Sequence, residues 1–94
     1  MELNSIEEVV EDLKKGKCVV IMDDENRENE GDVICAAEFA TTENVNFMAS
    51  YARGLICMPM APEYTDKLHL PQMCITNTDN HCTAFSVSVD HVST

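Results

Sequence analysis

Two short apolar runs, separated by a strongly charged segment, most constrain what this chain can fold into. Residues 18–22 form the first run and residues 33–37 the second, and both are bounded by polar residues or glycine. Runs of this length that contain valine and isoleucine are typical of buried strands. The ten-residue segment between them, residues 23–32, contains six carboxylates and one arginine. The pattern therefore predicts two buried strands joined by an acidic connection.

Helical periodicity is found on both sides of these strands. Ser5 is the expected N-cap, apolar residues follow it at positions i, i+3, i+4 and i+7, and a glycine comes after them. This pattern predicts an amphipathic helix over residues 5–15. A second helix is expected over residues 42–52, with Thr42 as its N-cap. A short third helix is expected over residues 62–68, because proline suits the first turn of a helix.

Two further strands complete the expected sheet. Residues 55–58 form a third apolar run, which a proline ends, and residues 83–89 alternate between apolar and polar side chains. Residues 76–80, which lie before this last strand, are rich in turn-forming residues. Helices and strands in this order predict an α+β fold, in which a mixed β-sheet packs against helices.

The charge balance argues against one class of partner. Among the 94 residues 17 are acidic and 6 are basic, so the formal net charge is −11. Such a chain repels nucleic acid and anionic membrane surfaces. The apolar runs are far shorter than the roughly 18 residues of a membrane span, and we expect neither export nor membrane insertion. The five cysteines are odd in number and widely spaced, so we expect reduced thiols in a cytoplasmic protein.

The acidic segment admits two interpretations. Crowded carboxylates destabilise a fold unless a cation offsets them, and their hard oxygen atoms suit Mg²⁺ or Mn²⁺. Alternatively, the segment is a solvated acidic turn. A calcium-binding EF-hand loop beginning at Asp24 is excluded, because Asn29 and Cys35 occupy the positions where it needs glycine and glutamate. Arg27 favours a binding site, since a guanidinium beside a metal-binding carboxylate can hold a phosphorylated substrate.

The order of residues in this segment is more specific than its composition. Residues 23–32 read Asp-Asp-Glu-Asn-Arg-Glu-Asn-Glu-Gly-Asp, which resembles the signature loop of the 3,4-dihydroxy-2-butanone 4-phosphate synthase family of riboflavin biosynthesis. Three further blocks follow in the family's order, at residues 37–38, 54–57 and 77–85. The resemblance therefore covers nearly the whole chain.

The resemblance implies an activity and an assembly. Members of the family are lyases that convert D-ribulose 5-phosphate to 3,4-dihydroxy-2-butanone 4-phosphate and formate, with Mg²⁺ or Mn²⁺ as cofactor, and they act as homodimers. Because the family domain is longer, we expect residues 1–94 to be the N-terminal portion of a single synthase domain. We also expect the fold to be incomplete relative to that domain, and the isolated chain to have little or no turnover.

The resemblance also assigns roles to residues of the acidic segment. It implies that Glu28 is a metal ligand, that Arg27, Glu28 and Asp32 contact the substrate, and that Glu30 lies close to the site. These residue types suit the chemistry, because a metal that bridges two substrate oxygens acidifies the adjacent C–H bond and carboxylates can then move protons. The catalytic set implied in this way consists of Glu28, Glu30, Asp32 and Cys57.

Two implied site residues lie outside the acidic segment. Cys57 resembles a cysteine that the family places near its site, although it could equally be a buried small apolar residue. Thr94 is adjacent to the position of a substrate-binding turn in the family. The family's second metal ligand is a histidine in a Gly-His-Thr segment, and none of the three histidines here stands in that context.

Two competing functions remain open at this level. The chain could be a catalytically dead acidic module that binds a metal or a partner protein through the same segment. It could also be a structural domain whose acidic segment is merely solvated. A solvated acidic segment can be distinguished from a metal-binding one by thermal unfolding. Only an ion that binds the folded chain raises its thermal midpoint in a concentration-dependent way.

Overall fold

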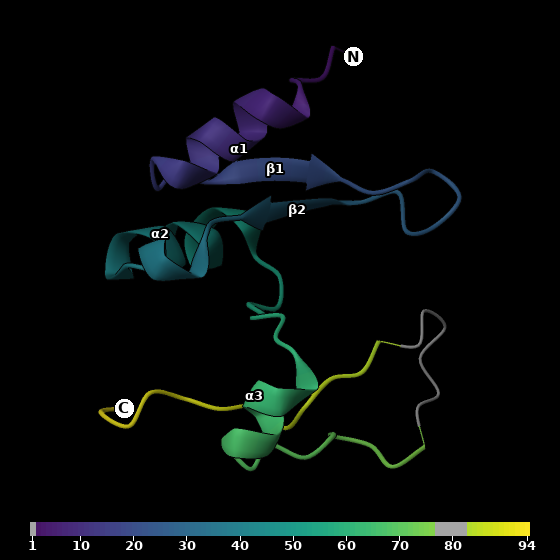
Figure 1. Ribbon diagram of the computed structural model, residues 1–94, viewed down its shortest axis with the longest axis vertical. Helices are drawn as coiled ribbons and strands as arrows, with labels where there is room; N and C mark the ends of the chain where they lie inside the picture. Colours follow the sequence, from purple (N-terminus) through teal and green to yellow (C-terminus); the bar gives the residue numbers. More distant parts are fainter. Residues whose placement is uncertain (1, 77–82) are drawn as a thin grey trace. The chain divides into compact units, whose positions relative to one another are not determined.

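Figure 1 shows the computed structural model, which describes residues 2–76 and 83–94. The chain divides into two compact units, Met1–Met58 and Pro59–Thr94. In chain order its elements are the α-helix α1 (Ile6–Lys14), the strands β1 (Val19–Met22) and β2 (Gly31–Ile34), the 3-10 helix η1 (Ala37–Phe39), the α-helix α2 (Thr42–Phe47), the π-helical turn η2 (Met48–Ala52) and the α-helix α3 (Pro62–Lys67).

The first helix, α1, confirms the capping pattern seen in the sequence. The Ser5 hydroxyl accepts a hydrogen bond from the Glu8 N–H at 3.2 Å, and Glu7 lies with Glu8 in the first turn, where acidic residues complement the helix dipole. Lys14 occupies the last turn, where a cation is favourable. The chain then leaves the helix at Gly16, whose φ of +82° is in the left-handed region.

The two strands expected beside the acidic segment form an antiparallel hairpin. The registered pairs are Val19↔Ile34, Val20↔Val33, Ile21↔Asp32 and Met22↔Gly31. The second strand begins and ends earlier than the apolar run at 33–37 suggested. It starts at Gly31 because that residue lies opposite the end of β1, and the chain turns into η1 at Ala37.

The second helix starts one residue earlier than the sequence suggested. Thr41 is the N-cap, not Thr42, because the Thr41 hydroxyl accepts the hydrogen bond from the Asn44 N–H at 3.1 Å. The expected helix over residues 42–52 is confirmed as α2 followed by η2. It ends at Arg53, where φ is +58° and the backbone N–H bonds to the Met48 carbonyl.

One contact joins the end of α1 to the beginning of α2. An ideal Cβ built on Gly16 would lie 2.9 Å from Cδ1 of Phe39, so the ring packs directly against the glycine backbone. The Asn44 side-chain amide donates to the Phe39 carbonyl at 2.8 Å and to the Gly16 carbonyl at 3.4 Å. Both bonds are partly buried, and the one to Gly16 joins residues that are 28 positions apart in the chain.

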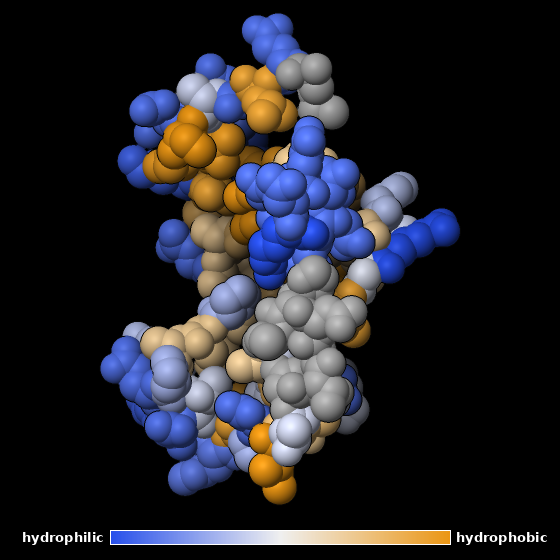
Figure 2. Space-filling view, turned by 90° about the vertical axis from the view of Figure 1, so that its right-hand side faces the viewer, coloured by the Kyte–Doolittle hydropathy of each residue, from blue (hydrophilic) through white to orange (hydrophobic). Residues whose placement is uncertain are grey.

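The third expected strand is absent from the described residues. Residues 55–58 have no regular secondary structure, and the side chains of Leu55 and Ile56 are 83% and 53% exposed. A strand requires a neighbour that accepts and donates backbone hydrogen bonds, and the described residues supply none here. None of the residues that the structure describes is fully buried. Apolar side chains are accordingly visible on the surface of the first unit, in the upper part of Figure 2.

The second unit contains α3, where the helix expected over residues 62–68 is confirmed with proline in its first turn. The prediction of a strand over residues 83–89 is wrong. Among the described residues, this segment forms only an isolated antiparallel bridge, which joins Gln72 to Ser86, and Phe85 is 43% exposed. The expected turn at 76–80 lies outside the described residues after its first position.

The α+β class is confirmed, since helices accompany a sheet in the first unit. The sheet itself differs from the expected mixed sheet, because its two described strands are antiparallel. Within residues 2–76 and 83–94, no helix has the length and apolar character needed to cross a membrane.

The Gly16 contact predicts a specific sensitivity to side-chain size. Gly16→Ala should lower the free energy of unfolding by about 2 kcal/mol, because the residue is held at positive φ and a methyl group would press on Phe39. Gly54→Ala is the matched control, since nothing lies within 4 Å of a Cβ at that position. Urea unfolding of both variants measures the difference, and equal losses would contradict this account.

Candidate functional site

The acidic loop, residues 23–30, connects β1 to β2 and is closed by its own backbone. The Asp23 N–H donates to the Glu30 carbonyl at 3.0 Å, which extends the hairpin pairing by one step. The Asp24 carbonyl shapes the tip of the loop, because it accepts hydrogen bonds from the backbone N–H of Arg27 at 3.0 Å and from that of Asn29 at 3.2 Å. Asn29 has a φ of +53°, a conformation that asparagine tolerates better than most residues. The loop is therefore shaped by local hydrogen bonds.

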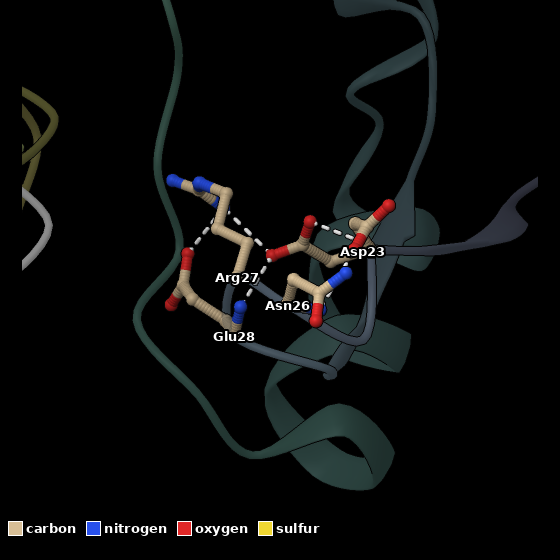
Figure 3. Close-up of polar contacts among 5 residues, drawn as sticks. Asp23, Asn26, Arg27 and Glu28 are labelled. Carbon is tan, nitrogen blue, oxygen red and sulfur yellow. Dashed lines mark hydrogen bonds and ion pairs between the residues drawn. The ribbon is translucent and has the colours of Figure 1, made fainter.

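The Asp23 carboxylate is the centre of the loop's polar contacts (Figure 3). Its Oδ1 accepts from the Asp24 N–H at 2.6 Å, and its Oδ2 accepts from the Glu28 N–H at 3.0 Å. The same Oδ2 accepts from Nη1 of Arg27 at 2.8 Å. The side chain is only 18% exposed, although the loop around it is open to solvent. Asp23 therefore acts as an internal anchor for the loop.

Arg27 bridges two carboxylates of the loop. Its Nη1 forms one ion pair with Asp23 and a second with Oε1 of Glu28, so the two carboxylates share one guanidinium group. The hydrogen bond to Asp23, followed by the charges of Glu28 and Asp23, raises the pKa of Arg27. The Arg27 side chain is still 54% exposed, and an anionic ligand could therefore reach it from solvent.

The same contacts change the acidity of Asp23. Loss of water around the carboxyl group would by itself raise its pKa. The hydrogen bond from the Glu28 N–H, the one from Arg27 and the one from the Asp24 N–H outweigh that effect, and the pKa lies below its ordinary value. These contacts therefore favour the ionised form of Asp23.

The structure brings together some of the residues singled out in the sequence and not others. Arg27 and Glu28 are in direct contact. The Glu30 carbonyl closes the loop, and Asp32 lies in β2 opposite Ile21. In the part of the chain that the structure describes, no hydrogen bond or ion pair joins the side chains of Glu30 and Asp32 to this pair.

Cys57 and Thr94 lie in irregular segments. The Cys57 thiol is exposed and contacts the Leu55 carbonyl at 3.9 Å, so the alternative interpretation as a buried apolar residue is wrong. The Thr94 hydroxyl donates to the His91 carbonyl at 2.7 Å, and the Thr94 N–H bonds to the same oxygen. Both contacts are local to their own units, Met1–Met58 and Pro59–Thr94.

Sequence reasoning missed the role of Asp23. The sequence pattern does not distinguish it from the other five carboxylates of residues 23–32, although its side chain accepts three of the loop's hydrogen bonds. A signal was available in its position directly after an apolar run, where a carboxylate can accept the free backbone N–H groups of the following turn. The position of Asp23 in the sequence does not show which basic side chain would form an ion pair with its carboxylate.

The carboxylates of the acidic loop meet only part of the requirement for binding a hard divalent cation. Among residues 2–76 and 83–94, no group of three or more histidine, cysteine, aspartate or glutamate side chains is placed to hold a metal. Glu28 offers a single carboxylate, of which Oε1 faces Arg27. Mg²⁺ is usually held by one or two protein carboxylates together with water and substrate oxygens, so Glu28 fits one position of such a shell.

Comparison with known proteins gives a consistent result. Residues 7–94 match the 3,4-dihydroxy-2-butanone 4-phosphate synthase family. The chain is 58% identical over 89 residues to the riboflavin biosynthesis protein RibBA of Bacillus mycoides (strain KBAB4), and equally so to RibBA of Bacillus cereus (strain B4264). Each alignment covers 95% of this chain and 22% of the relative, so the chain spans about a fifth of the length of these curated relatives.

Two solved structures resemble this fold. A 3,4-dihydroxy-2-butanone 4-phosphate synthase in complex with two magnesium ions matches 98% of this chain and 44% of its own, with a TM-score of 0.88 and 48% identity. RibBX from A. baumannii, a two-domain synthase, matches 82% of this chain and 23% of its own, with a TM-score of 0.74 and 44% identity.

The fold and the acidic loop place the chain in a class of α+β proteins that includes riboflavin biosynthesis enzymes. The chain belongs to the 3,4-dihydroxy-2-butanone 4-phosphate synthase family. The resemblance noted for residues 23–32 is thereby confirmed at the level of the family.

The contacts of Asp23 predict its titration. A ¹³C NMR titration of the Asp23 carboxyl group should give a midpoint below the ordinary aspartate value, because three donors stabilise the charged form. Arg27→Gln should move this midpoint upward, since one donor and its positive charge are lost. Arg53→Gln is the matched control and should leave it unchanged, because Arg53 bonds to Ser50 and not to the loop.

The sign of the linked stability follows from the lowered pKa. Ionised Asp23 contributes its full stabilisation above its pKa in the unfolded chain, and the contribution is lost as the pH falls through the lower pKa of the folded chain. A midpoint at or above the ordinary value in the wild-type chain would show that the three donors do not hold the carboxylate.

Proposed function

We propose that this chain forms the N-terminal part of one synthase domain, a carbon–carbon lyase that converts D-ribulose 5-phosphate to 3,4-dihydroxy-2-butanone 4-phosphate and formate in riboflavin biosynthesis. The observation that carries the proposal is the family match over residues 7–94, which includes the complete acidic loop. The Arg27–Glu28 pair supports it, because an exposed cation and a carboxylate lie side by side where a phosphorylated substrate and a metal ion would meet.

Glu28 is the residue proposed to hold Mg²⁺, with Mn²⁺ as the alternative ion. A related synthase has been solved with two magnesium ions, which supports this choice. When bound, the ion supplies Lewis acidity toward substrate oxygens, and this weakens the adjacent C–H bonds. Other residues of the chain are proposed to contact the substrate and to move protons.

Arg27 is proposed to hold an anionic group of the sugar phosphate. A guanidinium in this position offsets the strongly negative charge of the chain, which would otherwise repel the substrate. Asp23 positions Arg27 by accepting from its Nη1, so the guanidinium is held beside Glu28 before substrate arrives. This arrangement lowers the ordering cost of binding.

The remaining proposed site residues act on protons or contact substrate. Glu30 and Asp32 lie two and four positions after Glu28 in the chain, and carboxylates can accept and return protons. Asp32 is also proposed as a substrate contact. Cys57 and Thr94 complete the proposed site, the first as a catalytic residue with an exposed thiol and the second as a substrate contact.

We further propose that the enzyme acts as a homodimer in the cytoplasm, with a sugar phosphate as its small-molecule partner. Several large apolar side chains are exposed on this chain, including those of Leu55 and Ile56. Their exposure supports the proposal that further protein surface covers them in the active enzyme. The net charge of −11 supports the absence of a nucleic-acid partner.

Activity can be tested in a hybrid protein in which this chain replaces its matching segment of the B. mycoides RibBA. With Mg²⁺ and ribulose 5-phosphate, the hybrid should release formate. Glu28→Gln should lower kcat by about a hundredfold or more, because it removes the proposed metal ligand. Glu25→Gln, which removes one charge from the same loop, should stay within about twofold of the unmodified hybrid.

The outcomes of this assay separate the candidate functions. Formate release by the unmodified hybrid supports the lyase. A folded hybrid that binds Mg²⁺ without releasing formate would instead indicate a catalytically dead acidic module. Full activity in the Glu28→Gln hybrid would show that the metal assignment is wrong.

Metal binding can also be tested without turnover. Mg²⁺ should raise the thermal midpoint of the chain in a concentration-dependent manner, because an ion that binds only the folded state shifts the equilibrium by mass action. The rise should be lost in Glu28→Gln and retained in Glu25→Gln. A midpoint that does not respond to Mg²⁺ in the wild-type chain would support a merely solvated acidic loop.

A further inference from the structure

The hairpin register places two cysteines opposite each other. Cys18 directly precedes β1 and Cys35 directly follows β2, so they lie one step beyond the pair Val19↔Ile34 (Figure 1). This end of the hairpin is the one away from the acidic loop. Both thiols are free and partly exposed. The two cysteines are 17 positions apart in the chain and meet only through strand pairing.

The hydrogen-bond pattern identifies the kind of pair that the cysteines form. Asp23 and Glu30 face each other across a backbone hydrogen bond, and in an antiparallel ladder such pairs alternate with non-hydrogen-bonded ones. Counting back along the register, the hydrogen-bonded positions fall at Ile21 and Val19. Cys18 and Cys35 therefore occupy a non-hydrogen-bonded position, where side chains approach each other most closely.

The spacing at such a position suits a disulfide. Non-hydrogen-bonded pairs have Cα atoms about 4.5 Å apart, and disulfides bridge Cα atoms that are about 4.4–6.8 Å apart. The neighbouring Cys35 also affects the acidity of Cys18. Loss of solvent, followed by the charge of Cys35 and a hydrogen bond with its thiol, raises the pKa of Cys18. Cys35 thus lies close enough to Cys18 to influence the ionisation of the Cys18 thiol.

We propose that Cys18 and Cys35 form a reversible cross-strand disulfide by exchange with a small-molecule disulfide. The thiolate of one cysteine attacks a sulfur of the small disulfide, which forms a mixed disulfide and releases one small thiolate. The thiolate of the second cysteine then attacks the protein sulfur and releases the other small thiolate. The two protein thiols lose two electrons and two protons, and the small disulfide is reduced to two thiols.

The bond would constrain the hairpin that carries the acidic loop. It closes a loop from residue 18 to residue 35, which contains both strands and all of residues 23–30. Closing this loop reduces the conformational freedom of the unfolded chain. In a reducing compartment the pair stays open, and an oxidising one closes it. The proposal rests on the hairpin register and is independent of the proposed lyase activity.

Trypsin provides a direct test, because it cleaves after Lys17, Arg27 and Arg53. The full chain is incubated with oxidised glutathione, its remaining thiols are blocked, and it is digested without reduction. Peptide 18–27 contains only Cys18 and peptide 28–53 contains only Cys35. We expect these two peptides to be joined, in at least tenfold excess over any other disulfide-linked pair, and to separate on reduction.

Matched serine variants complete the test. Cys57→Ser and Cys74→Ser should leave the linked product unchanged, since both thiols lie in irregular segments and neither residue takes part in the β1–β2 pairing. Cys18→Ser and Cys35→Ser should each abolish it. Dominant links to peptides 54–67 or 68–94 would overturn the proposal, as would wild-type protein that carries glutathione on both cysteines without joining them. The wild-type digest decides the matter even if a variant fails to fold.

Discussion

The antiparallel pairing of β1 with β2 is the interaction on which the rest of this molecule depends. It is extended by the bond between the Asp23 N–H and the Glu30 carbonyl, which brings together the two ends of a strongly charged loop. At the opposite end of the hairpin, the same register places Cys18 and Cys35 as cross-strand neighbours. A slip of one residue would turn every strand side chain to the other face, so both features depend on one pattern of backbone hydrogen bonds.

The loop contains several carboxylates close together, and hydrogen-bond donors within the loop reduce the repulsion that one of them, Asp23, would otherwise add. Asp23 accepts from two backbone N–H groups and from Arg27, so its charge is offset by donors within the loop. Arg27 in turn reaches Glu28, and the pair remains accessible to solvent. A loop that was only solvated would need no such sharing. Here the internal anchor holds an exposed cation beside a carboxylate, and this is the arrangement on which the proposed binding of a metal ion and a phosphorylated substrate rests.

Sequence reasoning succeeded where the signals were local. The cap at Ser5 and the proline that begins α3 act within one helical turn, and both were predicted correctly. It failed at 55–58 and 83–89, which have the apolar composition of strands without forming them. Strand formation depends on a partner for the backbone hydrogen bonds, and composition carries no information about whether that partner is present.

The amino-acid sequence alone determined the helix boundaries to within a few residues, the position of the acidic loop and membership of the family. Those properties depend on the identity and order of neighbouring residues. Only the tertiary structure decided which carboxylate anchors the loop, that Arg27 is shared between Asp23 and Glu28, and that Cys18 meets Cys35. These outcomes depend on the register of two strands and the path of the loop between them, and backbone hydrogen bonds between separated segments set both.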